Sequence, residues 1–204
     1  MLIVGLTGGI ASGKSLVAQV LRDMGAQIID ADKIVHSLLS SGEEACNEVI
    51  VHFGETIRLP DGSIDRRKLG DIIFNHPEER TWLNNCIHPR VFQAYKQKVR
   101  HLIDRQPDSI VVLDAALLIE TGYNRYMDKL IVVYADQQDQ VKRLMERDRF
   151  TLEQALARIS SQMPLDEKRK YADYVIDNTG TREASEQQTR EVFEKLRQEA
   201  GKRE

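Results

Sequence analysis

The chain has 204 residues, which is enough for one large α/β domain with an insertion. Its composition, with 41% hydrophobic and 30% charged residues, is that of an ordinary soluble globular protein. The net charge of −3 gives no general attraction to nucleic acid or to anionic membranes, so we expect neither as a partner.

The first predicted element is a strand in the apolar run at residues 2–6. Residues 8–15 follow and read Gly-Gly-Ile-Ala-Ser-Gly-Lys-Ser, which fits the phosphate-binding pattern G-x-x-x-x-G-K-[ST]. A helical pattern then places Val17, Val20 and Leu21 on one face. Strand, loop and helix in this order form the context in which the motif binds nucleotide phosphates.

Each residue type in this loop suits a phosphate group. Glycines keep the loop open for backbone N–H groups, and the helix that follows presents the positive end of its dipole. Lys14 can reach the β- and γ-phosphates, and the Ser15 hydroxyl can bind Mg²⁺. We therefore expect ATP and Mg²⁺ as ligands. The predicted ATP-binding residues are Gly9, Ile10, Ala11, Ser12, Gly13, Lys14, Ser15 and Leu16.

Two aspartates stand at the end of the second predicted strand, residues 27–29. The carboxyl ends of strands carry the chemistry in parallel α/β sheets. If the strand continues, Asp30 and Asp32 lie on one face, whereas if it ends at Asp30, Asp32 starts the next helix. Either aspartate could instead cap a helix. For Asp30, a functional role and a helix cap are about equally well supported by the sequence. For Asp32 we favour a functional role.

Strand signals disappear over residues 33–107, where apolar side chains recur with helical spacing. We expect an inserted helical domain that binds the acceptor substrate, and a purely structural insertion is the alternative. Arg66 lies in a polar cluster of this region, and arginine suits phosphate recognition. His88 lies in another cluster and could equally support a turn at Pro89.

Further strands are predicted at 110–113, 130–133 and 174–176, before a last helix over about 182–198. The first of these strands is apolar throughout, as expected for a strand that is buried on both faces. It ends at Asp114, and an acid at this position resembles the Walker B aspartate that holds Mg²⁺.

Arginines gather in a predicted helix–loop–helix at about residues 143–170. Arg143 and Arg147 lie one turn apart, and Arg158 follows in the second helix. Such a group suits a lid that closes on a transferring phosphate, although any single arginine is more often a solvated surface charge. The second helix should begin with a capping box at residues 151–154. We expect the apolar side chains of both helices to be buried, namely Val141, Leu144, Met145, Leu152, Ala155, Leu156 and Ile159.

The two cysteines, Cys46 and Cys86, form no C-x-x-C motif and suggest neither a disulfide framework nor a zinc site. This usage fits a reducing cytosol. No apolar run approaches the ~20 residues of a membrane span, and the apolar N-terminus is too short for a signal peptide. We therefore expect a cytoplasmic protein. For its assembly, which the sequence does not determine, we expect a monomer or a weak homo-oligomer.

Taken in order, these motifs resemble those of the dephospho-coenzyme A kinases. The phosphate loop alone is shared with thousands of proteins, but the ordered set is specific and covers nearly the whole chain. The matching stretches are 6–15, 29–32, 62–66, 87–89, 114–120, 143–162 and 172–180.

The resemblance implies a P-loop kinase fold, an α/β three-layer sandwich with a five-stranded parallel sheet. Residues 1–32 and 108–204 would form the nucleotide-binding core, with its helical lid, and 33–107 the inserted CoA-binding domain. The implied reaction is the last step of coenzyme A synthesis, in which ATP and 3′-dephospho-CoA give ADP and CoA.

The resemblance also implies roles for single residues. Asp32 would accept the proton of the ribose 3′-hydroxyl, and Ser15 with Asp114 would hold Mg²⁺. The implied catalytic residues are Asp32, Lys14, Arg143 and Arg147, with Arg158 as a further lid arginine. The implied substrate-binding residues are Asp32, Arg66, His88, Leu118 and Glu120.

Three positions depart from the family pattern, which usually has Gly at Ala11, Thr at Leu16 and Pro at Ala116. Ala11 adds a Cβ beside the phosphates, so we expect a negative φ there. Ala116 could shift the turn that presents Leu118 and Glu120. None of the three departures removes a charged catalytic group.

Two other functions fit parts of the sequence. A kinase for another small acceptor, such as a nucleoside, would share the phosphate loop and the lid, and only the inserted region separates the two. A nucleotide-dependent switch that binds a protein partner is a third candidate. The sequence has no N-K-x-D motif for guanine, and the insertion looks like a pocket rather than an exposed patch.

Overall fold

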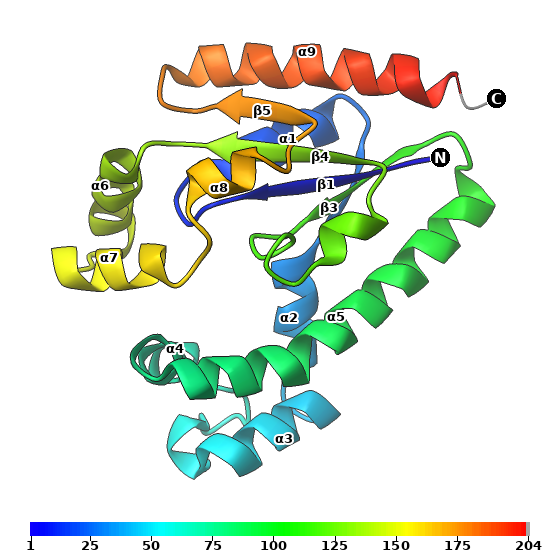
Figure 1. The fold of residues 1–204 in the computed structure, drawn as a ribbon. Coiled ribbons are helices and arrows are strands. Elements are labelled where there is room, and N and C mark those ends of the chain that lie inside the picture. Colours follow the sequence, from blue (N-terminus) through cyan, green and yellow to red (C-terminus); the bar gives the residue numbers. More distant parts are fainter. Residues whose placement is uncertain (203–204) are drawn as a thin grey trace. The chain divides into compact units, whose positions relative to one another are not determined.

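The computed structural model describes residues 1–202. A five-stranded parallel sheet is its central layer, in the order β2-β3-β1-β4-β5 (Figure 1). The strands span β1 Leu2–Gly8, β2 Gln27–Asp30, β3 Ile110–Asp114, β4 Lys129–Tyr134 and β5 Tyr174–Asp177. The predicted α/β class and all five predicted strands are therefore confirmed.

The chain divides into two compact units. The first comprises residues 1–29 and 99–204, and the second comprises residues 30–98. The second boundary falls inside a long helix, whereas we expected the inserted region to continue to residue 107. The helices and 3₁₀ turns of the first unit are α1 Lys14–Asp23, η2 Tyr123–Tyr126, α6 Gln137–Asp148, α7 Leu152–Ser160, α8 Leu165–Arg169 and α9 Arg182–Ala200.

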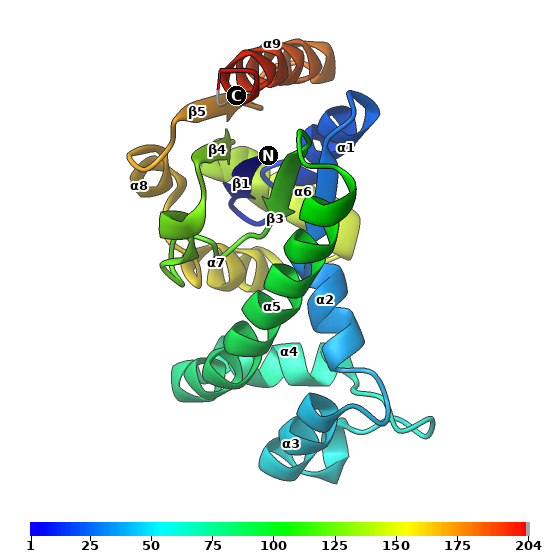
Figure 2. The same cartoon turned by 90° about the vertical axis from the view of Figure 1, so that its right-hand side faces the viewer.

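The core of the first unit lies between the sheet and the paired helices α1 and α9 (Figures 1 and 2). Alternate residues of each strand face these helices, as the period of a strand requires. Leu2, Val4 and Leu6 of β1 are all 0% exposed and meet Leu21 and Leu196 in this cluster. The predicted strand-first, helix-second pattern thus places the phosphate loop at the end of a buried central strand.

Helix α1 ends as the sequence predicts. Gly25 has a φ of 105°, its N–H donates to the Arg22 carbonyl at 2.9 Å, and the N–H of Ala26 donates to the Leu21 carbonyl at 3.0 Å. This is the paired hydrogen bonding of a Schellman stop, in which a left-handed residue follows the helix. The stop turns the chain back into β2.

The second unit contains helices packed around their own apolar cluster, which includes Cys46, Val49, Ile57 and Ile87. Its elements are α2 Ala31–Leu38, α3 Glu44–Phe53, η1 Glu55–Ile57, α4 Arg66–Asn75 and the greater part of α5 Pro77–Arg105. On α3, His52 stacks on Trp82 at a ring distance of 3.7 Å and bonds Glu79 at 2.6 Å. Both cysteines are buried and free.

Pro89 lies inside α5, so the turn that we considered at this position is wrong. Proline removes one helical hydrogen bond and crowds the preceding turn. The side chain of Arg90 donates to the Cys86 carbonyl at 2.7 Å and also pairs with Glu48 at 2.7 Å. These contacts join the turn that follows Pro89 to Glu48 of α3.

The burial that we expected for the two lid helices is only partly correct. Leu144 and Ala155 are 0% exposed, but Met145, Leu152 and Leu156 are 40%, 54% and 39% exposed. In α7, Arg158 takes an inner position instead, and its guanidinium lies 3.8 Å from the centre of the Phe150 ring. A cation–π contact therefore replaces the apolar packing that the helical pattern predicted.

Within residues 1–202, no helix is both long enough and apolar enough to cross a membrane.

Tyr174 allows a test of how α9 is attached to the sheet. Its hydroxyl donates to Glu199 at 2.7 Å, and burial, with this bond, raises the pKa of Tyr174 to about 12. Between pH 10 and 12 the unfolded chain loses this proton and the native chain keeps it, so the unfolding free energy falls as pH rises.

We expect Tyr174→Phe to remove the part of the loss of stability at high pH that comes from the ionisation of Tyr174. Urea unfolding of both proteins from pH 9 to 12 should show the variant less stable near pH 9 and the difference shrinking above pH 10. Tyr171→Phe, at a tyrosine that is 52% exposed, is the matched control and should leave the slope unchanged. A pH-independent difference for Tyr174→Phe would contradict the prediction.

Candidate functional site

The phosphate-binding loop joins β1 to α1, and an ion pair lies beneath it. The register of β1 and β3 places Leu6 opposite Asp114, so the two strands end at the same edge of the sheet. There Nζ of Lys14 contacts Oδ1 of Asp114. Asp114 is 7% exposed, so its carboxylate is held in a poorly solvated position beside the loop. The structure thus brings together two residues that the sequence singled out 100 positions apart.

Gly13 shows why glycine is needed in this loop. Its φ is 93°, and a Cβ at this position would collide with the side-chain amide of Asn178. That amide donates to the Ser12 carbonyl at 2.8 Å, and its oxygen accepts from the Ser185 hydroxyl at 2.7 Å. Glycine therefore admits a buried asparagine against the back of the loop, a packing reason that adds to its role on the phosphate side.

Other long side chains also hold the loop backbone. Gln140 donates to the Ile10 carbonyl at 2.6 Å, and Gln162 accepts from the Ile10 N–H at 2.9 Å. Arg143 donates to the carbonyls of Ala11 at 3.3 Å and Asn178 at 2.8 Å. In this arrangement Arg143 supports the loop from behind. A direct contact of Arg143 with a transferring phosphate stays a prediction.

Ala11 has a φ of 57°, so the negative φ that we expected is wrong. The left-handed conformation places Cβ close to the following carbonyl and disfavours every residue with a side chain. The loop keeps the backbone path that glycine would take, and alanine fits into it. The contact of Arg143 with the Ala11 carbonyl helps to hold this strained residue.

The loop contains two serines with different surroundings. Ser15 is exposed in the first turn of α1, where its hydroxyl is open to a ligand. Ser12 is 1% exposed, and its Oγ has no hydrogen-bond partner in the described structure. A buried hydroxyl without a partner is unfavourable and often marks a functional position.

The remaining lid arginines have separate partners. Arg147 is exposed, with a side chain that is 63% accessible, and pairs with its neighbour Asp148 through bonds of 3.0 and 2.7 Å. The hydrogen bond with this carboxylate raises the pKa of Arg147. Arg158 is buried against Phe150. Of these two, only Arg147 is open to solvent.

Leu118 and Glu120 lie in the segment after β3. Leu118 is 2% exposed, and a Cβ on Gly5 would lie 2.5 Å from its Cδ2, so its side chain covers the sheet. Glu120 accepts from the N–H of Met163 at 3.1 Å and pairs with the buried Lys168 at 2.9 Å. Substrate contacts by Leu118 and Glu120 stay predictions.

The second unit contains the other predicted site residues. Asp30 caps α2, with its carboxylate accepting from the N–H of Lys33 at 3.0 Å, so the strand ends at Asp30 and Asp32 lies exposed in the first helical turn. The guanidinium of Arg66 contacts the ring nitrogen Nδ1 of His36. His36 is four residues after Asp32, so these side chains share one face of α2.

His88 is half-buried in α5, within the second unit. It lies one residue before Pro89 in a continuous helix. A role for it in substrate binding stays a prediction.

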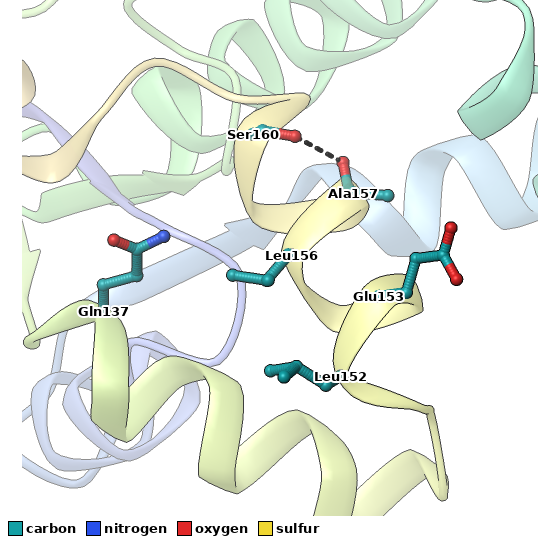
Figure 3. A pocket seen from close by; sticks show the side chains of 6 residues that line it. All are labelled: Gln137, Leu152, Glu153, Leu156, Ala157 and Ser160. Carbon is teal, nitrogen blue, oxygen red and sulfur yellow. Dashed lines mark hydrogen bonds between the residues drawn. The ribbon is translucent and has the colours of Figure 1, made fainter.

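An apolar groove of about 600 Å³ lies in the lid, between the start of α6 and α7 (Figure 3). Leu152 and Leu156 form its apolar wall, and Gln137 faces them from α6. The exposure of these leucines, which we expected to be buried, is thus localised to one surface. The residues that line the groove are Gln137, Leu152, Glu153, Leu156, Ala157 and Ser160.

Comparison with known proteins decides the family. A family model described as dephospho-CoA kinase matches residues 2–183. The chain belongs to the dephospho-CoA kinase family. Members of this family with similar sequences include that of Geobacillus kaustophilus, 48% identical over 92% of both chains, and that of Carboxydothermus hydrogenoformans, 46% identical over 95% of this chain and 93% of the other.

Solved structures agree with this membership. A dephospho-CoA kinase from Campylobacter jejuni is 30% identical, and its TM-score is 0.69 over 96% of this chain and 97% of the other. The family and the P-loop kinase fold that the motifs predicted are therefore confirmed.

Sequence reasoning missed three residues that the structure places at this family member's loop or on α2: Gln140, Lys168 and His36. Gln140 and Lys168 stand in polar helical stretches that look like solvated surface. The sequence carries no signal that separates such a side chain from its exposed neighbours, because the partner atoms are backbone carbonyls far away in the chain.

The strain at Ala11 leads to a stability prediction. Ala11→Gly should raise the unfolding free energy by about 0.5–1 kcal/mol, because relief of the left-handed conformation exceeds the greater entropy of the unfolded glycine. For a chain of this size, thermal unfolding should then shift upward by roughly 1–4 °C.

The matched control is Ala157→Gly, the same change within the regular helix α7. There glycine should lower stability by about 1 kcal/mol, because a helix favours alanine. A lower melting temperature for Ala11→Gly, as for the control, would contradict the prediction.

Proposed function

We propose that this member of the family, which forms CoA and ADP from dephospho-CoA and ATP, transfers the γ-phosphate to the 3′-hydroxyl with residues of the phosphate loop and residues of α2. The hydroxyl oxygen attacks phosphorus, the bond from phosphorus to the bridging oxygen of ADP breaks, and CoA and ADP are released. Such a reaction depends on positioning and on neutralising charge more than on covalent chemistry.

The observation that carries the proposal is the Lys14–Asp114 pair at the adjoining ends of β1 and β3. It supplies a cation at the loop and a buried carboxylate next to it. When the phosphates of ATP occupy the loop, Lys14 is the mobile charge that can turn from Asp114 to the β- and γ-phosphates. The loop amides hold the phosphates in place while the reaction proceeds.

The donors near the loop fit Mg²⁺. The hydroxyl of Ser15 and the carboxylate of Asp114 are hard oxygen donors, and Mg²⁺ typically takes one or two such groups together with phosphate oxygens and water. Within residues 1–202 there is no cluster of three or more acidic, histidine or cysteine side chains that could hold a metal ion. Bound Mg²⁺ would neutralise the charge of the β- and γ-phosphates.

Asp32 is the proposed general base. It is exposed on the first turn of α2 and shares a helix face with His36, which Arg66 of α4 contacts. Its neighbour Asp30 already serves as the helix cap. Arg66 is suited to a phosphate of the CoA substrate, since guanidinium groups bind such oxygens in pairs. Arg147 is the lid arginine whose exposure allows contact with the transferring phosphate.

We further propose that the protein acts in the cytoplasm, where ATP is available and where the two free, buried cysteines stay reduced.

The deciding assay is a coupled measurement of ADP release by purified protein with ATP, Mg²⁺ and dephospho-CoA. Parallel reactions with a panel of nucleosides test the other small-acceptor function. ADP release that depends on dephospho-CoA supports the proposal. Turnover that prefers a nucleoside, or that requires a partner protein and no small acceptor, overturns it.

Asp32→Asn should lower kcat by about 10²–10⁴, the usual effect of removing a positioned base, and should leave ATP affinity nearly unchanged. Steady-state kinetics with dephospho-CoA and nucleotide titration give the two quantities. Turnover near that of the unaltered protein would remove Asp32 from this role.

Asp30→Asn is the matched control. Asparagine caps helices about as well as aspartate, so α2 should keep its first turn and its position in the fold. We expect kcat to stay within about threefold of the unaltered value, because the change removes a charge outside the proposed proton transfer. An equal loss in both variants would mean that the general charge of this turn, and not Asp32 itself, matters.

A further inference from the structure

Lys168 of α8 is a lysine with 0% exposure, although the surrounding sequence is strongly polar. Its Nζ donates to the carbonyl of Gly8 at 3.2 Å and to the carbonyl of Ala116 at 2.7 Å, and it pairs with Glu120 at 2.9 Å. An ammonium group has three N–H donors, so these partners use all of them. The side chain therefore acts on the protein backbone and has no surface with which to touch a substrate.

We propose that Lys168 is a positioning residue for phosphate transfer, which fixes the start of the phosphate-binding loop to the end of the strand that carries Asp114. This inference rests on the proposed function, because it assigns Lys168 a part in nucleotide binding. A purely structural role would make Lys168 matter for stability alone.

The bond to Gly8 sets the direction of a peptide group in the loop. In a trans peptide the C=O and N–H groups point in opposite directions, and the described chain has no cis peptide bond. An ammonium group on the Gly8 carbonyl thus directs the N–H of Gly9 away from Lys168. Gly9 is one of the residues expected to bind ATP, so the lysine holds a loop amide in a defined orientation.

The bond to Ala116 links the same ammonium group to the neighbouring strand. Ala116 follows Asp114 by two residues, and its carbonyl also accepts from the Thr7 hydroxyl at 2.9 Å. The ends of β1 and β3 are therefore joined through one carbonyl oxygen. Movement of this segment would displace the Asp114 carboxylate from Lys14.

The segment that carries Lys168 is itself attached to the loop. Leu165 is 7% exposed, and a Cβ on Gly9 would lie 3.2 Å from its side chain. Glu120 forms an ion pair with Lys168 and accepts a hydrogen bond from the N–H of Met163. The residues near the loop thus include two ion pairs, Lys14–Asp114 and Lys168–Glu120.

Burial of Lys168 and its pairing with Glu120 have opposite effects on the pKa of the ammonium group. Burial lowers the pKa of Lys168, and the hydrogen bond to Glu120 acts in the opposite direction. An apolar residue of similar length would pack with less desolvation but would remove the donor to the Gly8 carbonyl and leave the Ala116 carbonyl with the Thr7 hydroxyl alone. The use of lysine at this position is explained by the backbone groups that it holds.

The test compares nucleotide and acceptor affinity in Lys168→Met. Isothermal titration with ADP, with a non-hydrolysable ATP analogue and with dephospho-CoA should show nucleotide binding weakened by about tenfold, because the loop loses its fixed shape. Dephospho-CoA binding should weaken clearly less than nucleotide binding, because Lys168 reaches the predicted substrate-binding residues only through Glu120. Lys170→Met is the matched control, because Lys170 is exposed, pairs with Glu167 at 2.7 Å and should leave both affinities unchanged.

A second variant covers the case in which Lys168→Met does not fold. Lys168→Arg keeps the charge and several donors, so the protein should fold, and its nucleotide affinity should lie between those of Lys168→Met and the unaltered protein. Unaltered nucleotide affinity in the folded Met variant, or in the Arg variant if only that one folds, would overturn the inference. Equal weakening of nucleotide and dephospho-CoA binding would also overturn it.

The unaltered protein separates this inference from the proposed function. If it binds neither ADP nor the ATP analogue, the proposed function fails. If it binds both and the Lys168 variants bind equally well, only the positioning role fails.

Discussion

A loop that binds phosphate must turn its N–H groups toward the anion, so its carbonyl groups face the protein and need donors there. This constraint explains most of the polar contacts that surround residues 8–13. Asn178 serves the Ser12 carbonyl, Gln140 that of Ile10, Arg143 that of Ala11 and Lys168 that of Gly8. A carbonyl left without such a donor would destabilise the fold or turn toward the ligand.

These donors come from α6, α8 and the end of β5, which follow the loop by more than a hundred residues. The parallel sheet makes this convergence possible, because the carboxyl ends of its strands meet at one edge. Arg143 has a structural contact with the loop in addition to its predicted catalytic role. We predicted it as a catalytic arginine, and it contacts the loop backbone and Asn178, so substitution of Arg143 would affect the loop as well as any charge on the phosphate.

Local patterns predicted those features that depend on neighbouring residues. The strand, loop and helix at residues 2–21, the Gly25 helix stop and the Thr151–Gln154 capping box all follow from short-range geometry. The patterns gave wrong predictions where contacts with residues outside the local pattern determine the structure. Pro89 lies inside a helix in which Arg90 bonds the Cys86 carbonyl. Arg158 occupies an inner position of α7, where leucines were expected. The role of Lys168 could not be predicted for the same reason, because an isolated lysine in a polar helix indicates only a solvated charge. The roles of Asp32, Arg66 and His88 stay predictions from the family motif.

Helix α7, like α4 and α6, buries few of its residues. Ala155 and Arg158 are its buried residues, and its order depends on the capping box and on the stack with Phe150. Opening this helix would expose little additional apolar surface, so its local free energy of unfolding should be far below that of α9, which buries Val192, Phe193 and Leu196. Amide hydrogens of α7 would then exchange with solvent through frequent local openings while the sheet stays intact.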